Sequence, residues 1–380
     1  MAASLVFAPA SAQLNNSAFY RNIVIKPQYA GDVRLTLDAL GFSKNNEYFN
    51  RMADGYTMFG YQFNPRLSYN PTENIRVEGG VFLQNDFGRD GKFTAMPTFT
   101  IKYAEDNYQL IFGTLQGSLN HRYIETLYDF ERVMNNRLEN GIQYIYTGPK
   151  FWLDGWIDWQ RMIYKGDPYQ EEIAGGISAE WRAWQSADSS LTFAVPLQFT
   201  AQHHGGQIDA TELPLLTVFN GATGFTLEKK FAKGSKVKSI YTRNYAVGFL
   251  DYSNEKIFPF ENGNGLYLNA GINTKWQEVM LSYWHGHDYI ALLGGQWYQA
   301  YSRSYNDTGY TEPARQVVIL RLMHDIKLWE GLILTLRLEP HYDLNNPGFE
   351  FSNSFHLNFN TDIFLKKVPT PQTEGLPFDN

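Results

Sequence analysis

Two tryptophans and two aspartates alternate along one short stretch of the chain. They share one parity of that stretch: Trp152, Asp154, Trp156 and Asp158. Because successive side chains of a β-strand point to opposite faces, all four would lie on one face of a strand. Indole rings stack on the C–H faces of sugars, and carboxylates accept hydrogen bonds from hydroxyl groups. The pattern therefore indicates a solute path, with the alternative that the rings fill space beneath an inserted loop.

The same stretch does not supply a catalytic carboxylate pair. On a strand, Asp154 and Asp158 would stand roughly 13 Å apart, too far for one carboxyl group to act on the other. The sequence also has no Walker A motif, no H-E-x-x-H, no G-x-S-x-G and no dinucleotide fingerprint. We therefore expect no catalytic residues, no cofactor and no enzyme. A lipase or protease with a few polar residues on a strand wall is the least favoured alternative.

Histidines stand in two close pairs near the ends of expected strands. His203 and His204 are adjacent, and His285 and His287 are separated by one glycine. Neutral imidazole is a common metal ligand. Neither pair has a third ligand at a regular spacing, so we predict polar residues at a rim and no metal site.

The elements that must position these residues are strands with one apolar and one polar face. In the C-terminal run, one parity is apolar: Phe355, Leu357, Phe359, Thr361, Ile363 and Leu365. The other parity is polar: His356, Asn358, Asn360 and Asp362. This period of two is typical of a strand that lies between two different environments.

The pattern repeats along the whole chain and predicts about 16 strands. We place them at residues 31–40, 56–69, 75–86, 94–104, 107–117, 138–147, 151–163, 171–184, 190–202, 213–229, 236–251, 264–274, 277–290, 314–326, 331–343 and 350–366. The connections alternate between short, turn-rich segments and long loops such as 41–55 and 118–137. This alternation of connections predicts an all-β fold, a transmembrane antiparallel β-barrel with short periplasmic turns and long extracellular loops. The strands at 213–229 and 236–251 alternate poorly.

Composition agrees with an all-β protein. Aromatic residues make up 16% of the chain and charged residues 19%, which suits pleated sheets. No run of about 18 apolar residues is present, which excludes helical membrane spans. The absence of Cys excludes disulfides, thiolate metal sites, a Cys nucleophile and a lipoprotein anchor. The net charge of -7 without a basic stripe argues against nucleic acid as a partner.

The two ends of the chain differ in composition from the segment that we assign to the barrel. Residues 1–12 resemble the remnant of a signal peptide, with a cleavage site after Ala12, and a flexible N-terminus is the alternative. We assign residues 13–30 to a periplasmic N-terminal segment, 31–366 to the transmembrane β-barrel and 367–380 to a flexible C-terminal tail.

Three stretches carry a resemblance to a known group of proteins. They are Glu78 to Gly88, Asn120 to Glu125 with Leu127 to Arg132, and Asp154 to Trp159. Together with the strand count, they resemble an uncharacterised porin-like family of Bacteroidota, and more broadly the bacterial outer-membrane porins. The resemblance implies a Gram-negative outer membrane as the location.

By analogy with general porins, the third extracellular loop, residues 118–137, would fold into the lumen and narrow it. Its carboxylates would face basic side chains of the wall and form a pore constriction that orients dipolar solutes. The resemblance implies these constriction residues: Glu125, Asp129, Glu131, Arg34, Arg66, Arg76, Arg321 and Arg337. The Pro-Glu-Phe-Gly-Gly type sequence of general porins is missing from this loop. A helix that caps the barrel from outside is the alternative.

We therefore expect a passive diffusion channel in contact with outer-membrane lipid, carrying small hydrophilic solutes and using no cofactor. A barrel of about 16 strands is wide enough for a water-filled path unless loops plug it. The alternative is a structural or scaffold barrel of a secretion or assembly complex. A homotrimer and an assembly with partner proteins of the outer membrane both stay open.

Overall fold

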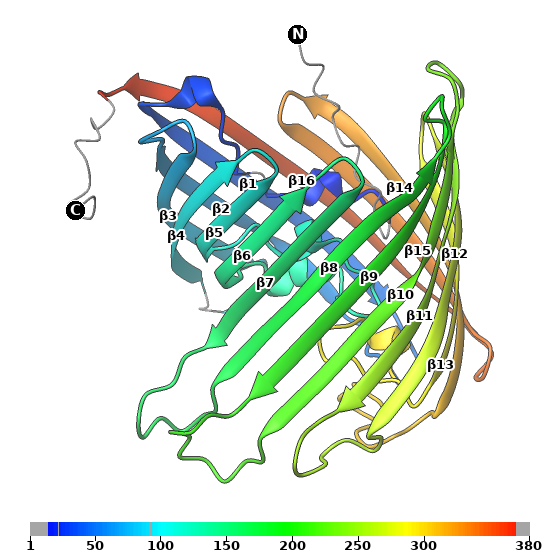
Figure 1. The fold of residues 1–380 in the computed structure, drawn as a ribbon. Helices are drawn as coiled ribbons and strands as arrows, with labels where there is room; N and C mark the ends of the chain where they lie inside the picture. The colour runs from blue at the N-terminus through cyan, green and yellow to red at the C-terminus, as the bar shows by residue number, and fades with distance from the viewer. Residues whose placement is uncertain (1–13, 22, 91–92, 370–380) are drawn as a thin grey trace.

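The computed structural model describes residues 14–21, 23–90 and 93–369. The expected signal remnant and most of the expected C-terminal tail lie outside these residues. Sixteen strands form one closed antiparallel barrel, in which each strand pairs with its neighbour in sequence and β1 also pairs with β16 (Figure 1). The predicted fold class is confirmed.

The strands have the following bounds: β1 (Asp32–Glu47), β2 (Thr57–Tyr69), β3 (Ile75–Asp86), β4 (Thr94–Glu105), β5 (Tyr108–Thr114), β6 (Asn140–Thr147), β7 (Phe151–Arg161), β8 (Glu172–Gln185), β9 (Leu191–His204), β10 (Leu216–Lys230), β11 (Val237–Asp251), β12 (Asn262–Thr274), β13 (Glu278–His287), β14 (Ala314–Trp329), β15 (Leu332–Asp343) and β16 (Gly348–Lys367). The described residues also form five short helical turns, two before β1 and three between strands: η1 (Ser17–Phe19), η2 (Pro27–Tyr29), η3 (Ser118–His121), α1 (Arg132–Asn135) and η4 (Gln296–Tyr298). None of the helices in the described residues is long and apolar enough to cross a membrane.

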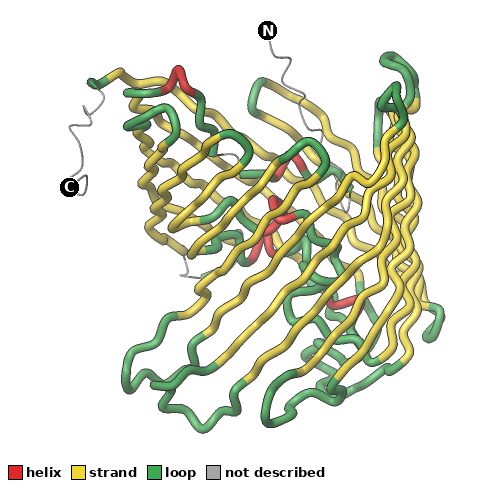
Figure 2. The backbone as a smooth tube through the Cα atoms, viewed as in Figure 1, coloured by secondary structure: helices red, strands yellow, loops and turns green. Residues whose placement is uncertain are grey.

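On most strands the polar face is the buried face. On β16, Phe355 and Leu357 are 44% and 39% exposed, whereas His356 and Asn358 are 0% and 7% exposed. The apolar parity therefore covers the outside of the barrel and the polar parity points inward, as in barrels that contact lipid. The short turns gather at the end where β1 begins, and the long loops at the other end (Figure 2).

Inserted chain occupies part of the interior of the barrel. The loops 115–139 and 288–313 carry fully buried side chains, among them Ile124, Leu127, Tyr289 and Ile290, each 0% exposed. They pack on apolar residues of the wall to form one interior core. Residues 14–21 and 23–30, expected as a periplasmic segment, contact the inner wall, where Phe19 is 3% and Ile23 is 2% exposed.

This interior core explains where the expected strands differ from the observed ones. The inner face of β10 and β11 is apolar because Val218, Tyr245 and Val247 pack on the inserted chain, so these strands show little alternation. On β1, Leu40 and Phe42 lie on the inward parity and are 1% and 2% exposed, so the inner face is apolar where a polar one is expected. The prediction that residues 41–47 belong to a loop is wrong for this reason, since β1 continues to Glu47.

Candidate functional site

Residues 118–137, here called the inserted loop, cross the lumen of the barrel. On one side, the backbone N–H of Ile124 donates to the side chain of Gln198 on β9 at 3.0 Å. On the other side, Gln62 on β2 donates to the carbonyl oxygens of Val133 and Met134 at 3.2 and 3.0 Å. The inserted loop is thus tied to two walls that lie seven strands apart in the barrel order.

Residues 288–313, the second inserted loop, lie against the inserted loop. The backbone N–H of Gly295 donates to the carbonyl of Glu125 at 2.9 Å, and that of Asp129 donates to the carbonyl of Leu293 at 2.8 Å. The Tyr289 hydroxyl donates to the carbonyl of Thr126 at 3.0 Å. Because these bonds are made in the buried core, the two loops support each other.

Glu125 meets two of the basic wall residues that the sequence places at the constriction. Its carboxylate contacts Arg321 at 2.5 Å and Arg337 at 3.3 Å. Both guanidiniums also bond Glu339 of the wall, at 3.1 and 2.7 Å. The structure therefore brings Glu125, Arg321 and Arg337 together as a closed network of ion pairs rather than as separate charges facing water.

The other two loop carboxylates have different surroundings from those expected. Glu131 pairs with Lys44 at 2.8 Å and accepts a hydrogen bond from the Tyr56 hydroxyl. Asp129 contacts no basic side chain among the described residues, and its carboxylate accepts the backbone N–H of Glu131 at 3.0 Å. Burial and the neighbouring Glu131 carboxylate raise the pKa of Asp129.

The remaining predicted constriction residues bond carboxylates of the wall, which differs from the expectation that they face the loop. Arg34 contacts Asp362 at 3.0 Å, and Arg76 contacts the same carboxylate at 3.3 Å. Arg66 contacts Glu78 at 3.0 Å. Glu78 is 1% exposed and also bonds Arg76 and Arg21, so it is the centre of this second network.

The tryptophan and aspartate stretch lies beneath the inserted loop. Trp156 and Trp152 are 3% and 4% exposed, and the Trp156 ring stacks on His121 with ring centres 4.6 Å apart. Asp154 contacts Nδ1 of His121 at 2.9 Å, and Asp158 accepts the backbone N–H of Asn140 at 2.7 Å. The Trp156 ring packs under the inserted loop, whereas Trp152 lines a cavity of the lumen, and the solute path stays a prediction.

Sequence analysis did not single out His121, which is held between two carboxylates. Its Nε2 contacts Glu139 at 2.8 Å, opposite the contact of Nδ1 with Asp154, and all three side chains are 0% exposed. Burial alone would lower the pKa of His121, but the two carboxylates outweigh it and raise the pKa to about 10. The imidazole is therefore a fixed cation that ties the inserted loop to the wall.

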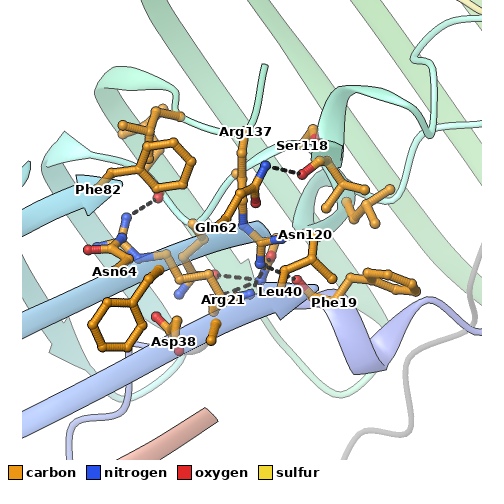
Figure 3. Close-up of a pocket in the computed structure, with 18 residues that line it drawn as sticks. Phe19, Arg21, Asp38, Leu40, Gln62, Asn64, Phe82, Ser118, Asn120 and Arg137 are labelled. Atoms are coloured by element: carbon orange, nitrogen blue, oxygen red, sulfur yellow. Dashed lines mark hydrogen bonds between the residues drawn. The ribbon is translucent and has the colours of Figure 1, made fainter. Parts of the chain in front are cut away.

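Three cavities follow one side of the lumen. A cavity of about 430 Å³ lies near the long loops, and one of about 320 Å³ lies near the short turns. Between them, a space of about 30 Å³ is lined by Arg21, Gln62, Arg137 and their neighbours (Figure 3). The middle space has room for only one or two water molecules.

The outer face of the barrel carries a hydroxyl–imidazole pair, here called the outer-face pair. His203 on β9 and Thr217 on β10 lie opposite each other in the strand register, and Nδ1 of His203 is 2.9 Å from Oγ1 of Thr217. Both side chains belong to the outward parity, next to Phe199 and Phe219, whose rings stack outside at 5.8 Å. The predicted rim histidine His203 thus has a partner that its sequence neighbours do not reveal.

A second polar group lies on the outer face at the same end of the barrel. The Thr57 hydroxyl donates to the side-chain carbonyl of Asn45 at 2.7 Å, and the Asn45 amide donates to Glu47 at 2.6 Å. These residues, here called the β1–β2 patch, lie on the outward parity where the end of β1 pairs with the start of β2. The patch has a hydroxyl and a carboxylate but no imidazole beside them.

The closed barrel with an apolar outer face and a polar inner face defines an outer-membrane protein of the porin type. Three solved structures are similar in fold: OprD from Pseudomonas aeruginosa (TM-score 0.50, 11% identity, 90% of this chain and 98% of that chain), OccK11 (OpdR) from Pseudomonas aeruginosa (0.50, 10%, 91% and 100%) and OccAB4 from Acinetobacter baumannii (0.50, 10%, 89% and 100%). At this identity, the likeness shows the fold alone. The predicted outer-membrane location and porin-like resemblance are confirmed.

Residues 25–368 match the model of a family described as lipid A 3'-O-deacylase-type, and the chain belongs to this family. No curated protein matches the chain. The expectation that the protein is not an enzyme is wrong, because the family is described by an enzymatic activity. Motif searching missed this because the known nucleophile motifs are local in sequence, whereas residues on neighbouring strands are joined only by the sheet register.

Proposed function

We propose that the protein is an outer-membrane hydrolase that removes an acyl chain from lipid A. The observation that carries the proposal is the lipid-facing pair of His203 and Thr217, 2.9 Å apart, in a chain of a lipid A 3'-O-deacylase-type family. A nucleophilic hydroxyl needs a base within hydrogen-bond reach, and this pair meets that requirement.

The pair supports a two-step ester hydrolysis. Oγ1 of Thr217 attacks the ester carbonyl carbon while Nδ1 of His203 takes the hydroxyl proton. The ester C–O bond breaks, the sugar hydroxyl leaves with the proton from His203, and an acyl-threonine remains. Water, deprotonated by His203, then attacks this acyl group and releases the fatty acid, which restores the Thr217 hydroxyl.

The position of the outer-face pair suits a lipid substrate. Aromatic side chains gather beside it on the outer wall, where Tyr252 is 69% exposed and packs on Phe219 with ring centres 5.9 Å apart. Exposed aromatic rings of this kind mark the boundary between lipid tails and headgroups. Acyl esters of an outer-leaflet lipid lie at this boundary, so the ester can reach Thr217 without entering the lumen.

The test is the release of fatty acid from lipid A by the purified protein in detergent micelles. We expect free fatty acid to accumulate with the folded protein and not with a heat-unfolded sample. A Thr57→Val variant serves as the control for the β1–β2 patch. If fatty acid release stops in Thr57→Val and continues in Thr217→Val, the activity belongs to the β1–β2 patch and the assignment of the pair is overturned.

The cavities in the lumen support a second candidate function. The cavities of about 430 and 320 Å³ at its two ends would form a path for small hydrophilic solutes if the inserted loop moved. The protein would then also act as a diffusion channel, narrowed by residues 118–137, and a scaffold barrel with a closed lumen is the alternative. This function uses the inside of the wall and is compatible with hydrolysis outside it.

We expect the single-channel conductance to increase severalfold when Leu119 to Asn136 are replaced by a short Gly-Ser linker. The physical reason is that the inserted loop fills the cross-section that a barrel of 16 strands would otherwise leave to water. Conductance in a planar bilayer is the measurement, with the intact chain as reference. No current from either form, with both barrels folded, would contradict the channel and favour the scaffold.

A further inference from the structure

Residues 14–21, here called the strap, cross the lumen ahead of β1. At one end, Leu14 belongs to an apolar cluster with Met280 of β13. At the other end, Arg21 contacts the carboxylate of Glu78 on β3 at 3.3 Å. In the barrel order, β2, β1, β16, β15 and β14 lie between β3 and β13. The strap therefore connects two distant parts of the inner wall.

The strap lines the narrow space between the two large cavities. Phe19 and Arg21 are part of the lining of this space of about 30 Å³ (Figure 3). The space shares Arg137 and Leu138 with the lining of the cavity of about 430 Å³. It shares Asn120 with the lining of the cavity of about 320 Å³. The strap therefore lies where the two cavities would meet.

The Arg21 side chain is the main polar tether of the strap. Its Nη1 donates to the carbonyl oxygens of Thr114 and Leu115 at 3.1 and 2.6 Å, where β5 leads into the inserted loop. Its Nη2 donates to Oγ1 of Thr100 on β4 at 3.2 Å. These bonds replace water around a guanidinium that is buried, so the strap has a defined seat on the wall.

The strap also contacts the inserted loop. The backbone N–H of Arg21 donates to the side-chain carbonyl of Asn120 at 3.1 Å, and the Asn120 amide donates to the carbonyl of Arg21 at 3.1 Å. The Phe19 ring packs edge-on against Phe130 with ring centres 5.3 Å apart, and it is 3% exposed. The strap is therefore bonded to the start of the inserted loop and packed against its second half.

The wall beneath the strap keeps its own contacts without it. Glu78 pairs with Arg66 at 3.0 Å and with Arg76 at 2.8 Å, so its carboxylate stays compensated when Arg21 is absent. The strap takes no part in the pairing of β3 with β2 and β4. The strap can therefore leave its seat while the barrel stays folded.

We propose that the strap is an autoinhibitory barrier of the lumen. While Phe19 and Arg21 occupy the space between the two cavities, they block the path of small solutes along β1 to β5, and release of the strap joins the cavities. This inference rests on the second candidate function, the diffusion channel. It assigns the barrier to the strap and not to the inserted loop alone, and it is independent of hydrolysis at the outer face.

The test is the single-channel conductance of a full chain in which residues 14–21 are replaced by alternating Gly and Ser. We expect a severalfold increase over the parent chain, because the Phe19 ring and the Arg21 guanidinium are both removed from the space between the cavities. Phe19→Ala keeps the Arg21 tether and should give a smaller increase. Gln28→Ala is the matched control, since Gln28 is an exposed residue between the strap and β1, and its conductance should equal that of the parent chain.

Thiol labelling gives a second measurement that does not depend on current. The chain has no Cys, so Thr100→Cys supplies a single thiol at a position that is 0% exposed and bonded by Arg21. Buried thiols are inert, so a water-soluble maleimide should react about tenfold faster or more when the Gly-Ser sequence replaces the strap. Equal labelling rates with and without the strap would overturn the proposal.

The conductance outcomes separate the strap from the channel. If the chain with Leu119 to Asn136 replaced conducts more than the parent chain and the Gly-Ser strap chain does not, the channel stands and the strap inference is overturned. If neither conducts with both barrels folded, both fail. Far-UV circular dichroism and the heat-dependent shift in gel migration establish folding. If the Gly-Ser strap chain does not fold, Phe19→Ala decides the question, and an unchanged conductance overturns the inference.

Discussion

Replacing Glu78 by Gln is expected to lower the free energy of unfolding by about 3–5 kcal/mol, the range for removing one partner of a buried ion pair. The Glu78 carboxylate is 1% exposed and bonds Arg76 at 2.8 Å, Arg66 at 3.0 Å and Arg21 at 3.3 Å. The amide keeps the shape of the side chain and loses the charge. The guanidiniums then remain buried near one another without their shared anion.

The measurement is a urea titration of the protein in detergent, followed by far-UV circular dichroism. Glu73→Gln is the matched control, since Glu73 is an exposed carboxylate in the turn just before β3. Surface changes of this kind usually stay within about 0.5 kcal/mol. Equal unfolding curves for the Glu78 and Glu73 variants would show that water or other wall residues compensate the guanidiniums, contrary to the buried network described above.

Replacing His203 by Ala is expected to lower the rate of fatty acid release from lipid A by about 10²–10⁴-fold, the usual contribution of a general base. His203 is the group within hydrogen-bond reach of the Thr217 hydroxyl, at 2.9 Å. Without it, the hydroxyl keeps its proton and is a weak nucleophile. The rate with lipid A in excess is the quantity to compare.

His285→Ala is the matched control for this variant. His285 belongs to the outward parity of β13, near the same end of the barrel, and pairs with Gln316 of β14 in the register. We expect its rate to equal that of the parent chain. A loss of the same size in both variants would point to a general effect on the rim and against a specific base.

The fold could be predicted from the sequence wherever the two faces of a strand meet different environments. On β16 the contrast between Phe355 and His356 is maintained along the strand, so parity, register and barrel closure follow from local pattern. On β1 and β10 the inner face packs on inserted chain, and Leu40 and Val218 are apolar on the side expected to be polar. Alternation fails there because apolar side chains also lie on the inner face.

The candidate site was less predictable because its contacts join residues far apart in sequence. In the structure the inserted loop lies inside the lumen and Glu125 contacts Arg321, while their role as a pore constriction stays a prediction. His121 and Asp154 are 33 residues apart, and their contact depends on how the loop folds back. His203 was predicted only as a rim histidine. Its partner Thr217 lies on the neighbouring strand, and the contact depends on how β9 and β10 pair.

The most direct test of the central claim is mass spectrometry of lipid A from Gram-negative cells that carry the protein in their outer membrane. The account predicts lipid A lighter by one acyl chain in cells with the parent chain. It predicts unchanged lipid A in cells with Thr217→Val, at equal amounts of folded protein. Lipid A of the same mass in both cells would contradict the claim that the outer wall of this barrel is a deacylase.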